Sequence, residues 1–217
     1  MPFFDATSDM YAEGAPLGYF CGGADNQPGF FKWWNNPEAC ALDVTNPEAT
    51  AWFVNKLKAL QAKHGIDGYK FDAGEPCFLP RQFRTHNPIA TPAEYTRLYV
   101  QHVASHFDLC EVRTGHQNQD LTLFTRMGDR FSTWGLSNGL RSLIPTLLTS
   151  GLAGYPFCLP DMIGGNGYFG QKPDPELLVR WAQVNALMPA MQFSIAPWDL
   201  SKDAELMCKQ VTASGLP

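Results

Sequence analysis

Several signatures of common protein classes are missing from this chain of 217 residues. It has no cluster of Lys and Arg, and its net charge is −5, so nucleic acid is not expected as a partner. No apolar run reaches the ~20 residues that cross a bilayer, and the first residues, MPFFDATSD, do not resemble a signal peptide. With 45% hydrophobic and only 17% charged residues, the composition instead predicts a globular protein with a sizeable core.

Cofactor and metal motifs are scarce as well. The six cysteines contain no CxxC pair, which excludes zinc fingers and thioredoxin-like sites, and we expect mainly buried free thiols. His102 and His106 have the i, i+4 spacing of helical metal ligands, but neither an HExxH glutamate nor a third ligand accompanies them. The motif GxxxxGK[ST] does not occur, which argues against a phosphate loop of that kind. No cofactor and no metal are therefore predicted.

The chain alternates short β-like runs with amphipathic helices. Asn46 and Asp174 are expected as helix N-caps, and Gly65 is expected to end the first helix. Alternation of this kind favours a parallel α/β architecture. Helices are predicted at about 46–65, 91–106, 140–152 and 174–187, and strands at 66–72, 107–113, 121–128 and 154–160, with a last apolar run, MPAMQFS, at 188–194.

Polar residues follow the carboxyl ends of successive predicted strands, where the chemistry of a (β/α)8 TIM barrel is located. They are Asp72, Arg113, Asp129 and Asp161. A barrel is therefore preferred over an open sheet, but the chain is shorter than the ~250 residues typical of that fold. We predict an incomplete TIM barrel, about strands 3 to 8, in residues 1–200, followed by a tail, 201–217, of uncertain relation to it.

Two of these polar residues are candidates for catalysis. Asp72 ends the apolar strand IDGYKFD with Glu75 close by, although an aspartate after a strand also serves as a helix N-cap. Asp129 follows about two βα units later, although a salt bridge with Arg126 or Arg130 would also explain it. Two carboxylates on a barrel rim among aromatic residues predict glycoside hydrolysis.

Tryptophans support the same interpretation. Trp33, Trp34 and Trp134 are candidates for stacking on sugar faces, although tryptophan is more often part of a core.

Five segments occur in the order in which glycoside hydrolase family 31 has its motifs. They are WWNNPEACALDVTNPEATAWF, IDGYKFDAGEP, EVRTG, MGDRFSTWG and GYPFCLPDMIGG. The chain resembles that family over residues 1 to about 200. The phrases KFDAGE, GLRSLIPTLL, GYPFCLPDMIGGN and MPAMQFSIAPW are most similar to a branch with α-galactosidase-like specificity.

The resemblance implies a retaining, exo-acting α-glycosidase. It implies Asp72 as nucleophile after the fourth barrel strand and Asp129 as acid/base after the sixth, with Trp34, Arg113 and Asp161 binding substrate. Trp134 is added to the substrate-binding set as a candidate stacking residue. Ser194 stands where the α-glucosidases of the family have a sugar-binding His, which favours galactosides.

Two alternatives stay open. The chain is either an α-glucosidase or α-xylosidase of the same family, or an inactive or carbohydrate-binding fragment that lacks part of the barrel. The expected partner is a glycoside or oligosaccharide, and family resemblance implies the secretory pathway: endoplasmic reticulum lumen, lysosome or extracellular space. The oligomeric state is not predicted.

Overall fold

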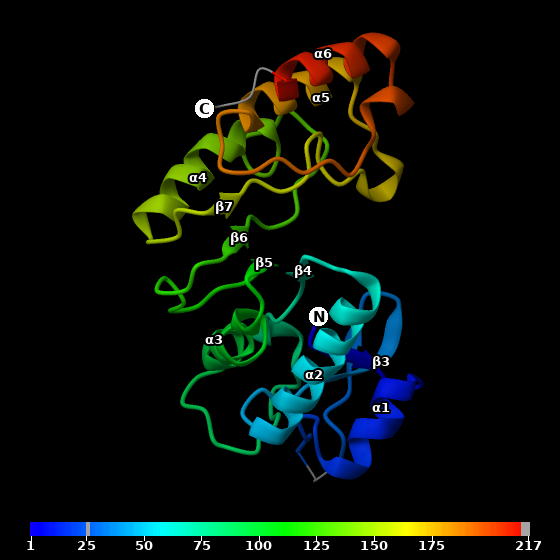
Figure 1. The fold of residues 1–217 in the computed structure, drawn as a ribbon, viewed down its shortest axis with the longest axis vertical. Coiled ribbons are helices and arrows are strands. Elements are labelled where there is room, and N and C mark those ends of the chain that lie inside the picture. Colours follow the sequence, from blue (N-terminus) through cyan, green and yellow to red (C-terminus); the bar gives the residue numbers. More distant parts are fainter. Residues whose placement is uncertain (25–26, 214–217) are drawn as a thin grey trace. The chain divides into compact units, whose positions relative to one another are not determined.

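The computed structural model describes residues 1–24 and 27–213 and divides into two compact units, Met1–Leu123 and Phe124–Pro217 (Figure 1). Each unit packs around its own hydrophobic core. Among the described residues, no helix combines the length and the apolar content that crossing a membrane requires.

Two kinds of strand pairing occur in the first unit. Strands β1 (Phe3–Asp5), β3 (Asn36–Ala41) and β2 (Phe31–Trp33) form an antiparallel sheet in that order. Strands β4 (Gly68–Phe71) and β5 (Leu109–Val112) pair in parallel, with Phe71 opposite Val112. Because parallel neighbours end at the same edge, the residues that follow β4 and β5 come together.

The helices of the first unit are α1 (Asp9–Gly14), α2 (Pro47–His64) and α3 (Ala93–His102). Asn46 caps α2 as expected, because its side chain accepts from the amides of Glu48 and Ala49, and Gly65 ends the helix in the left-handed conformation. Short 3-10 turns span Ala15–Leu17, Pro76–Phe78 and Ala104–His106. Tyr95 and Tyr99 are the largest fully buried side chains of α3.

The second unit contains the parallel pair β6 (Phe124–Arg126) and β7 (Cys158–Leu159) and the helices α4 (Leu143–Leu152), α5 (Pro175–Asn185) and α6 (Lys202–Ala213). Asp174 caps α5 by accepting from Leu177 N. Helices α5 and α6 lie side by side (Figure 1), and Trp181 of α5 is fully buried. The 3-10 turns are Leu140–Ser142, Tyr168–Gly170 and Pro197–Asp199.

Much of the region predicted as a tail is therefore helical. Ala204 and Cys208 of α6 are buried in the second core, while residues 214–217 lie outside the described part of the chain. Five cysteines are buried free thiols, and Cys77 is an exposed one.

The apolar run at 188–194 forms no regular strand in this structure. Only one parallel bridge forms there, between Phe193 and Ile163, with Ile163 N donating to Gln192 O at 2.8 Å. The reason lies in the partner segment: β7 has two residues, and Asp161, with φ 66°, turns the chain away just after it. Pro189 also lacks an amide hydrogen that a ladder would need.

Candidate active site

Asp72 begins a tight loop directly after β4. The next two residues, Ala73 (φ 63°) and Gly74 (φ 97°), both have left-handed backbone conformations. A Cβ atom on Gly74 would lie 2.6 Å from Cδ1 of Tyr99, so no side chain fits there. Ala73 is fully buried in a conformation that strains a non-glycine residue, and such strain is concentrated at functional sites.

Three buried or half-buried hydroxyl groups stabilise this loop. Thr96 and Tyr99 come from α3, and Thr114 follows β5. Because each hydroxyl satisfies a carbonyl group that no strand partner reaches, the loop has a defined conformation. The bonds run from Tyr99 to the Asp72 carbonyl at 3.3 Å, from Thr114 to Ala73 at 3.1 Å and from Thr96 to Gly74 at 2.7 Å.

Arg113, just after β5, brings two carboxylates of the first unit together. Its Nε and Nη2 atoms lie 2.7 and 3.0 Å from the two carboxylate oxygens of Glu75, whereas Nη1 lies 3.2 Å from Asp72 Oδ1. The guanidinium also lies over the ring of Trp33, 5.7 Å from its centroid. The Asp72 side chain is 39% exposed against 10% for Arg113, so it is accessible to a ligand.

The N-cap explanation for Asp72 does not apply. The next helical turn, Pro76–Phe78, has Glu75 at its N-cap position, with no side-chain cap hydrogen bond. A structural contact that Asp72 does make is the ion pair with Arg113.

The two neighbouring tryptophans of the first unit differ. Trp33 is 7% exposed and packs against Phe3 and Phe78, so it belongs to the core. Trp34 lies in the turn between β2 and β3 with φ 51° and is 57% exposed. In the second unit Trp134 is 39% exposed, on the loop that follows Asp129. Trp34 and Trp134 therefore present surfaces for stacking.

Asp129 follows β6 and receives two hydrogen bonds from the second unit. Arg126 Nη1 donates to its Oδ1 at 3.0 Å, and the hydroxyl of Tyr168 donates to its Oδ2. The salt bridge with Arg126 that was considered for Asp129 is therefore present. Arg130 instead directs its guanidinium to Ser142 Oγ at 3.0 Å and Thr146 Oγ1 at 3.2 Å.

Asp161 is fully buried beneath Asp129. Its Oδ1 accepts from Arg126 Nη1 at 2.7 Å, and its Oδ2 accepts from the backbone amide of Arg130 at 2.8 Å and from Asn166 Nδ2 at 2.7 Å. Since both oxygens have internal donors, the contacts of Asp161 orient Arg126 rather than a ligand.

The Tyr168 hydroxyl contacts the Asp129 carboxylate and the Tyr99 hydroxyl contacts the backbone carbonyl of Asp72, and both tyrosines keep their protons. Burial, reinforced by the hydrogen bond to Asp129, raises the pKa of Tyr168 above its usual value. Burial, then the charges of Asp72 and Glu75, raises the pKa of Tyr99 well above its usual value. Both groups are thus hydrogen-bond donors at neutral pH.

Tyr168 was not predicted from the sequence. It lies in the segment 165–170, GNGYFG, which has the GxGxxG spacing of a dinucleotide-binding loop. That motif requires a long helix after it, whereas here only the 3-10 turn Tyr168–Gly170 follows. The glycine-rich spacing gave no indication that its tyrosine contacts Asp129.

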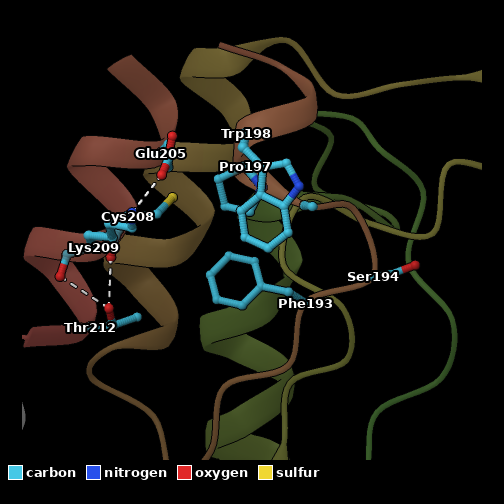
Figure 2. Close-up of a pocket in the computed structure, with 9 residues that line it drawn as sticks. Phe193, Ser194, Pro197, Trp198, Glu205, Cys208, Lys209 and Thr212 are labelled. Carbon is cyan, nitrogen blue, oxygen red and sulfur yellow. Dashed lines mark hydrogen bonds and ion pairs between the residues drawn. The ribbon is translucent and has the colours of Figure 1, made fainter. Parts of the chain in front are cut away.

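Ser194 borders a hollow of about 310 Å³ between the segment 193–198 and α6. Figure 2 shows the aromatic rings of Phe193 and Trp198 together on one side of this segment, with the Ser194 hydroxyl pointing away from them. The apolar hollow and the Ser194 hydroxyl are thus separate features.

Metal-ligating residues do not gather in the described ranges, 1–24 and 27–213, where no group of three His, Cys, Asp or Glu could hold an ion. His102 places its Nδ1 2.8 Å from the carbonyl oxygen of Val44, a structural contact.

Comparison with known proteins places the chain in a family. Residues 2–212 match the glycosyl hydrolases family 31 TIM-barrel domain. Mouse (Mus musculus) myogenesis-regulating glycosidase is 44% identical over 95% of this chain and 30% of its own length. The sulfoquinovosidase of Escherichia coli strain K12 is 28% identical over 88% of this chain and 30% of its own length.

Solved structures show the same fold. A GH31 family sulfoquinovosidase from E. rectale, in complex with an aza-sugar inhibitor, superposes with a TM-score of 0.81 at 24% identity, covering 97% of this chain and 34% of that one. The chain therefore spans about a third of the length of the relatives that it matches.

Proposed function

This chain belongs to glycoside hydrolase family 31, and on that premise we propose that the protein containing it is a retaining, exo-acting α-glycosidase. Asp72 is the nucleophile and Asp129 the acid/base. The observation that carries the proposal is the Asp72 loop: an accessible carboxylate at the end of a parallel strand, oriented by Arg113 and by a strained, hydroxyl-supported backbone. Its strands β4 to β7 are then consecutive strands of the family's TIM barrel.

In the first step, a carboxylate oxygen of Asp72 attacks the anomeric carbon while the bond to the leaving oxygen breaks, and Asp129 gives its proton to that oxygen. In the second, Asp129 takes a proton from water, the water oxygen attacks the anomeric carbon, and Asp72 is released. Retention requires the two carboxyl groups to lie about 5–5.5 Å apart in the complete enzyme.

The other predicted residues support these steps. Arg113 contributes a guanidinium next to Asp72. Trp34 contributes an exposed aromatic face for a sugar ring. Trp134 offers a second such face in the other unit. The predicted role of Asp161 in binding substrate is revised to positioning Arg126, because its carboxylate is fully buried and internally bonded.

The proposed specificity is for α-galactosides. A galactoside and a glucoside differ only in the orientation of one hydroxyl, so discrimination depends on which polar groups meet it. The support is Ser194 in place of the family's sugar-binding His and the segment MPAMQFSIAPW around it.

Turnover by the full-length protein tests both the retaining mechanism and the galactoside specificity. The substrates are the para-nitrophenyl α-glycosides of galactose, glucose, xylose and sulfoquinovose, with Asp72→Asn as the blank and NMR to follow the anomer first released. We expect preferential cleavage of the galactoside with release of the α-anomer.

Equal or faster cleavage of another glycoside contradicts the specificity, and release of the β-anomer contradicts the retaining mechanism. Saturable sugar binding without any turnover identifies the carbohydrate-binding alternative.

A further inference from the structure

The two oxygens of Asp129 meet different kinds of donor. Oδ1 faces the guanidinium of Arg126, which carries only N–H donors, whereas Oδ2 faces the Tyr168 hydroxyl, which can donate or accept. A proton on Oδ1 would point at another donor. These contacts therefore favour Oδ2 as the site of the proton in the acid form of Asp129.

Arg126 cannot relieve this constraint by moving. Its side chain is 2% exposed, and the same Nη1 atom that contacts Asp129 also lies 2.7 Å from Asp161 Oδ1 and 2.9 Å from the carbonyl of Met127. Asp161 is itself held by the amide of Arg130 and by Asn166. The donor at Oδ1 is thus part of the core of the second unit.

We propose that Tyr168 is the positioning residue of the acid/base: its hydroxyl accepts the Oδ2 proton of Asp129 before the reaction, that proton turns to the leaving oxygen in the first step, and the hydroxyl then donates to Oδ2 of the resulting carboxylate. The inference rests on the proposed function, since it assigns a partner to the acid/base of that reaction. The hydroxyl rotates between the two steps, but the tyrosine neither gains nor loses a proton.

The surroundings of Tyr168 suit this role. Its ring packs edge-on against Phe131, with 6.5 Å between the ring centroids, which restricts the position of the hydroxyl. The charged or titratable groups that face Asp129 from the second unit are Arg126 and Tyr168, with Asp161 behind Arg126 and Arg130 next in the chain. Burial keeps Tyr168 protonated, because it raises the pKa of the phenol.

Tyr168→Phe removes the hydroxyl that can donate to or accept from Asp129 and keeps the aromatic ring. A hydroxyl donates more strongly to a carboxylate than it accepts from a carboxylic acid, so its loss disfavours the ionised form of Asp129. We expect the Asp129 pKa to rise by about one unit, the size expected for one charge-assisted hydrogen bond.

The direct test is a carbon NMR titration of full-length protein labelled at the aspartate carboxyl carbons. Asp129→Asn identifies the Asp129 signal, and Tyr19→Phe, which removes a phenol packed on Trp52 in the first unit, serves as the matched control. We expect the titration midpoint of Asp129 to move upward in Tyr168→Phe and to stay unchanged in Tyr19→Phe. An unchanged midpoint in Tyr168→Phe overturns the proposal, whether or not the enzyme turns over.

Kinetics provides a second readout that a merely structural role would not change. With a dinitrophenyl glycoside, whose leaving group needs no proton, the first step is insensitive to the acid and the second still needs the base. In Tyr168→Phe we expect kcat and KM to fall together as the glycosyl-enzyme accumulates, and the alkaline limb of kcat/KM for a poor leaving group to shift upward by about one pH unit.

Unchanged kcat and KM with both substrates would overturn the role in catalysis. If the Asp129 midpoint shifts in Tyr168→Phe but the wild-type protein hydrolyses no glycoside, the proposed function is refuted while the Tyr168 contact is established.

Discussion

In the first unit Arg113 approaches Glu75 to 2.7 Å and Asp72 to 3.2 Å, and in the second Arg126 approaches Asp161 to 2.7 Å and Asp129 to 3.0 Å. Both arginines thus serve two carboxylates, and in both the carboxylate outside the proposed catalytic pair takes the shorter contact. Arg113 uses different nitrogen atoms for its two carboxylates, whereas a single atom of Arg126, Nη1, contacts both of its own.

The two arrangements differ in burial. Arg113 is 10% exposed and Glu75 24%, whereas Arg126 is 2% exposed and Asp161 is fully buried. Removing one member of a buried ion pair leaves a charge without solvent, which costs far more than removing a partly exposed one. The first arrangement is therefore expected to tolerate substitutions that the second does not, and its substitutions should act mainly on catalysis.

The largest effect is expected for Asp72→Asn in the full-length protein. Losing the proposed nucleophile should lower kcat by about 10⁴-fold or more, with little change in stability because Asp72 is half-exposed. Turnover of the para-nitrophenyl α-galactoside and thermal unfolding measure the two properties. Asp67→Asn, at the opposite end of β4, is the matched control and should retain activity. Substantial turnover by Asp72→Asn would show that another group is the nucleophile.

Asp161→Ala tests the buried arrangement. The substitution removes one of the negative charges that balance the buried Arg126 guanidinium, and it removes the acceptor for the Arg130 amide and Asn166. We therefore expect a loss of about 3–5 kcal/mol in the free energy of unfolding. Denaturant unfolding of the full-length protein measures it, with the exposed Asp199→Ala as the control. A loss below about 1 kcal/mol would place Asp161 among ordinary surface ion pairs.

Gly74→Ala separates backbone strain from steric overlap in the first unit. Its Cβ would lie 2.6 Å from the Tyr99 ring, so we expect a loss of about 2–3 kcal/mol and a fall in kcat as the Asp72 loop shifts. Gly65→Ala is the matched control, because its φ of 63° is also positive but nothing lies within 4 Å of the added carbon. It should cost only about 1 kcal/mol. Equal losses in the two variants would exclude the overlap as the cause.

Local signals predicted helices better than strands. Asn46 with Pro47, and Asp174 with Pro175, began helices where expected, because capping depends on residues adjacent in sequence. The helix predicted to begin near residue 91 begins at Ala93: Glu94 accepts from the amide of Ala90, and Pro92 occupies the cap position. The antiparallel sheet of β1, β2 and β3 was not predicted. Strand β1 joins β3 from far along the chain, with Phe4 opposite Cys40, whereas β2 and β3 form a short hairpin.

The candidate site was predicted in part. The sequence drew attention to Asp72, Arg113 and Asp129 because polar residues after apolar strands are conspicuous. The structure brings Arg113 to 3.2 Å from Asp72, and the catalytic roles stay predictions. The sequence could not distinguish the buried Asp161 from the accessible Asp72, since both follow strands and only packing separates them. Nor could it identify Tyr168, which reaches Asp129 from a loop 39 residues further along the chain.

The smallest expected effects concern the helix caps, one in each unit. The Asn46 side chain accepts from Glu48 N at 2.9 Å and Ala49 N at 3.4 Å, and Asp174 accepts from Leu177 N at 2.8 Å. Asn46→Ala and Asp174→Ala should each lower the free energy of unfolding by about 1 kcal/mol, because a buried or half-buried amide loses its acceptor.

Glycine at the same positions supplies the control for these caps. It lets water reach the free amides, so Asn46→Gly and Asp174→Gly should cost only a few tenths of a kcal/mol. The denaturation midpoints of the alanine and glycine variants are compared in the full-length protein. Turnover should stay unchanged, because neither cap approaches Asp72 or Asp129. If the glycine variants lose as much stability as the alanine variants, the side-chain hydrogen bonds are not what stabilises the starts of α2 and α5.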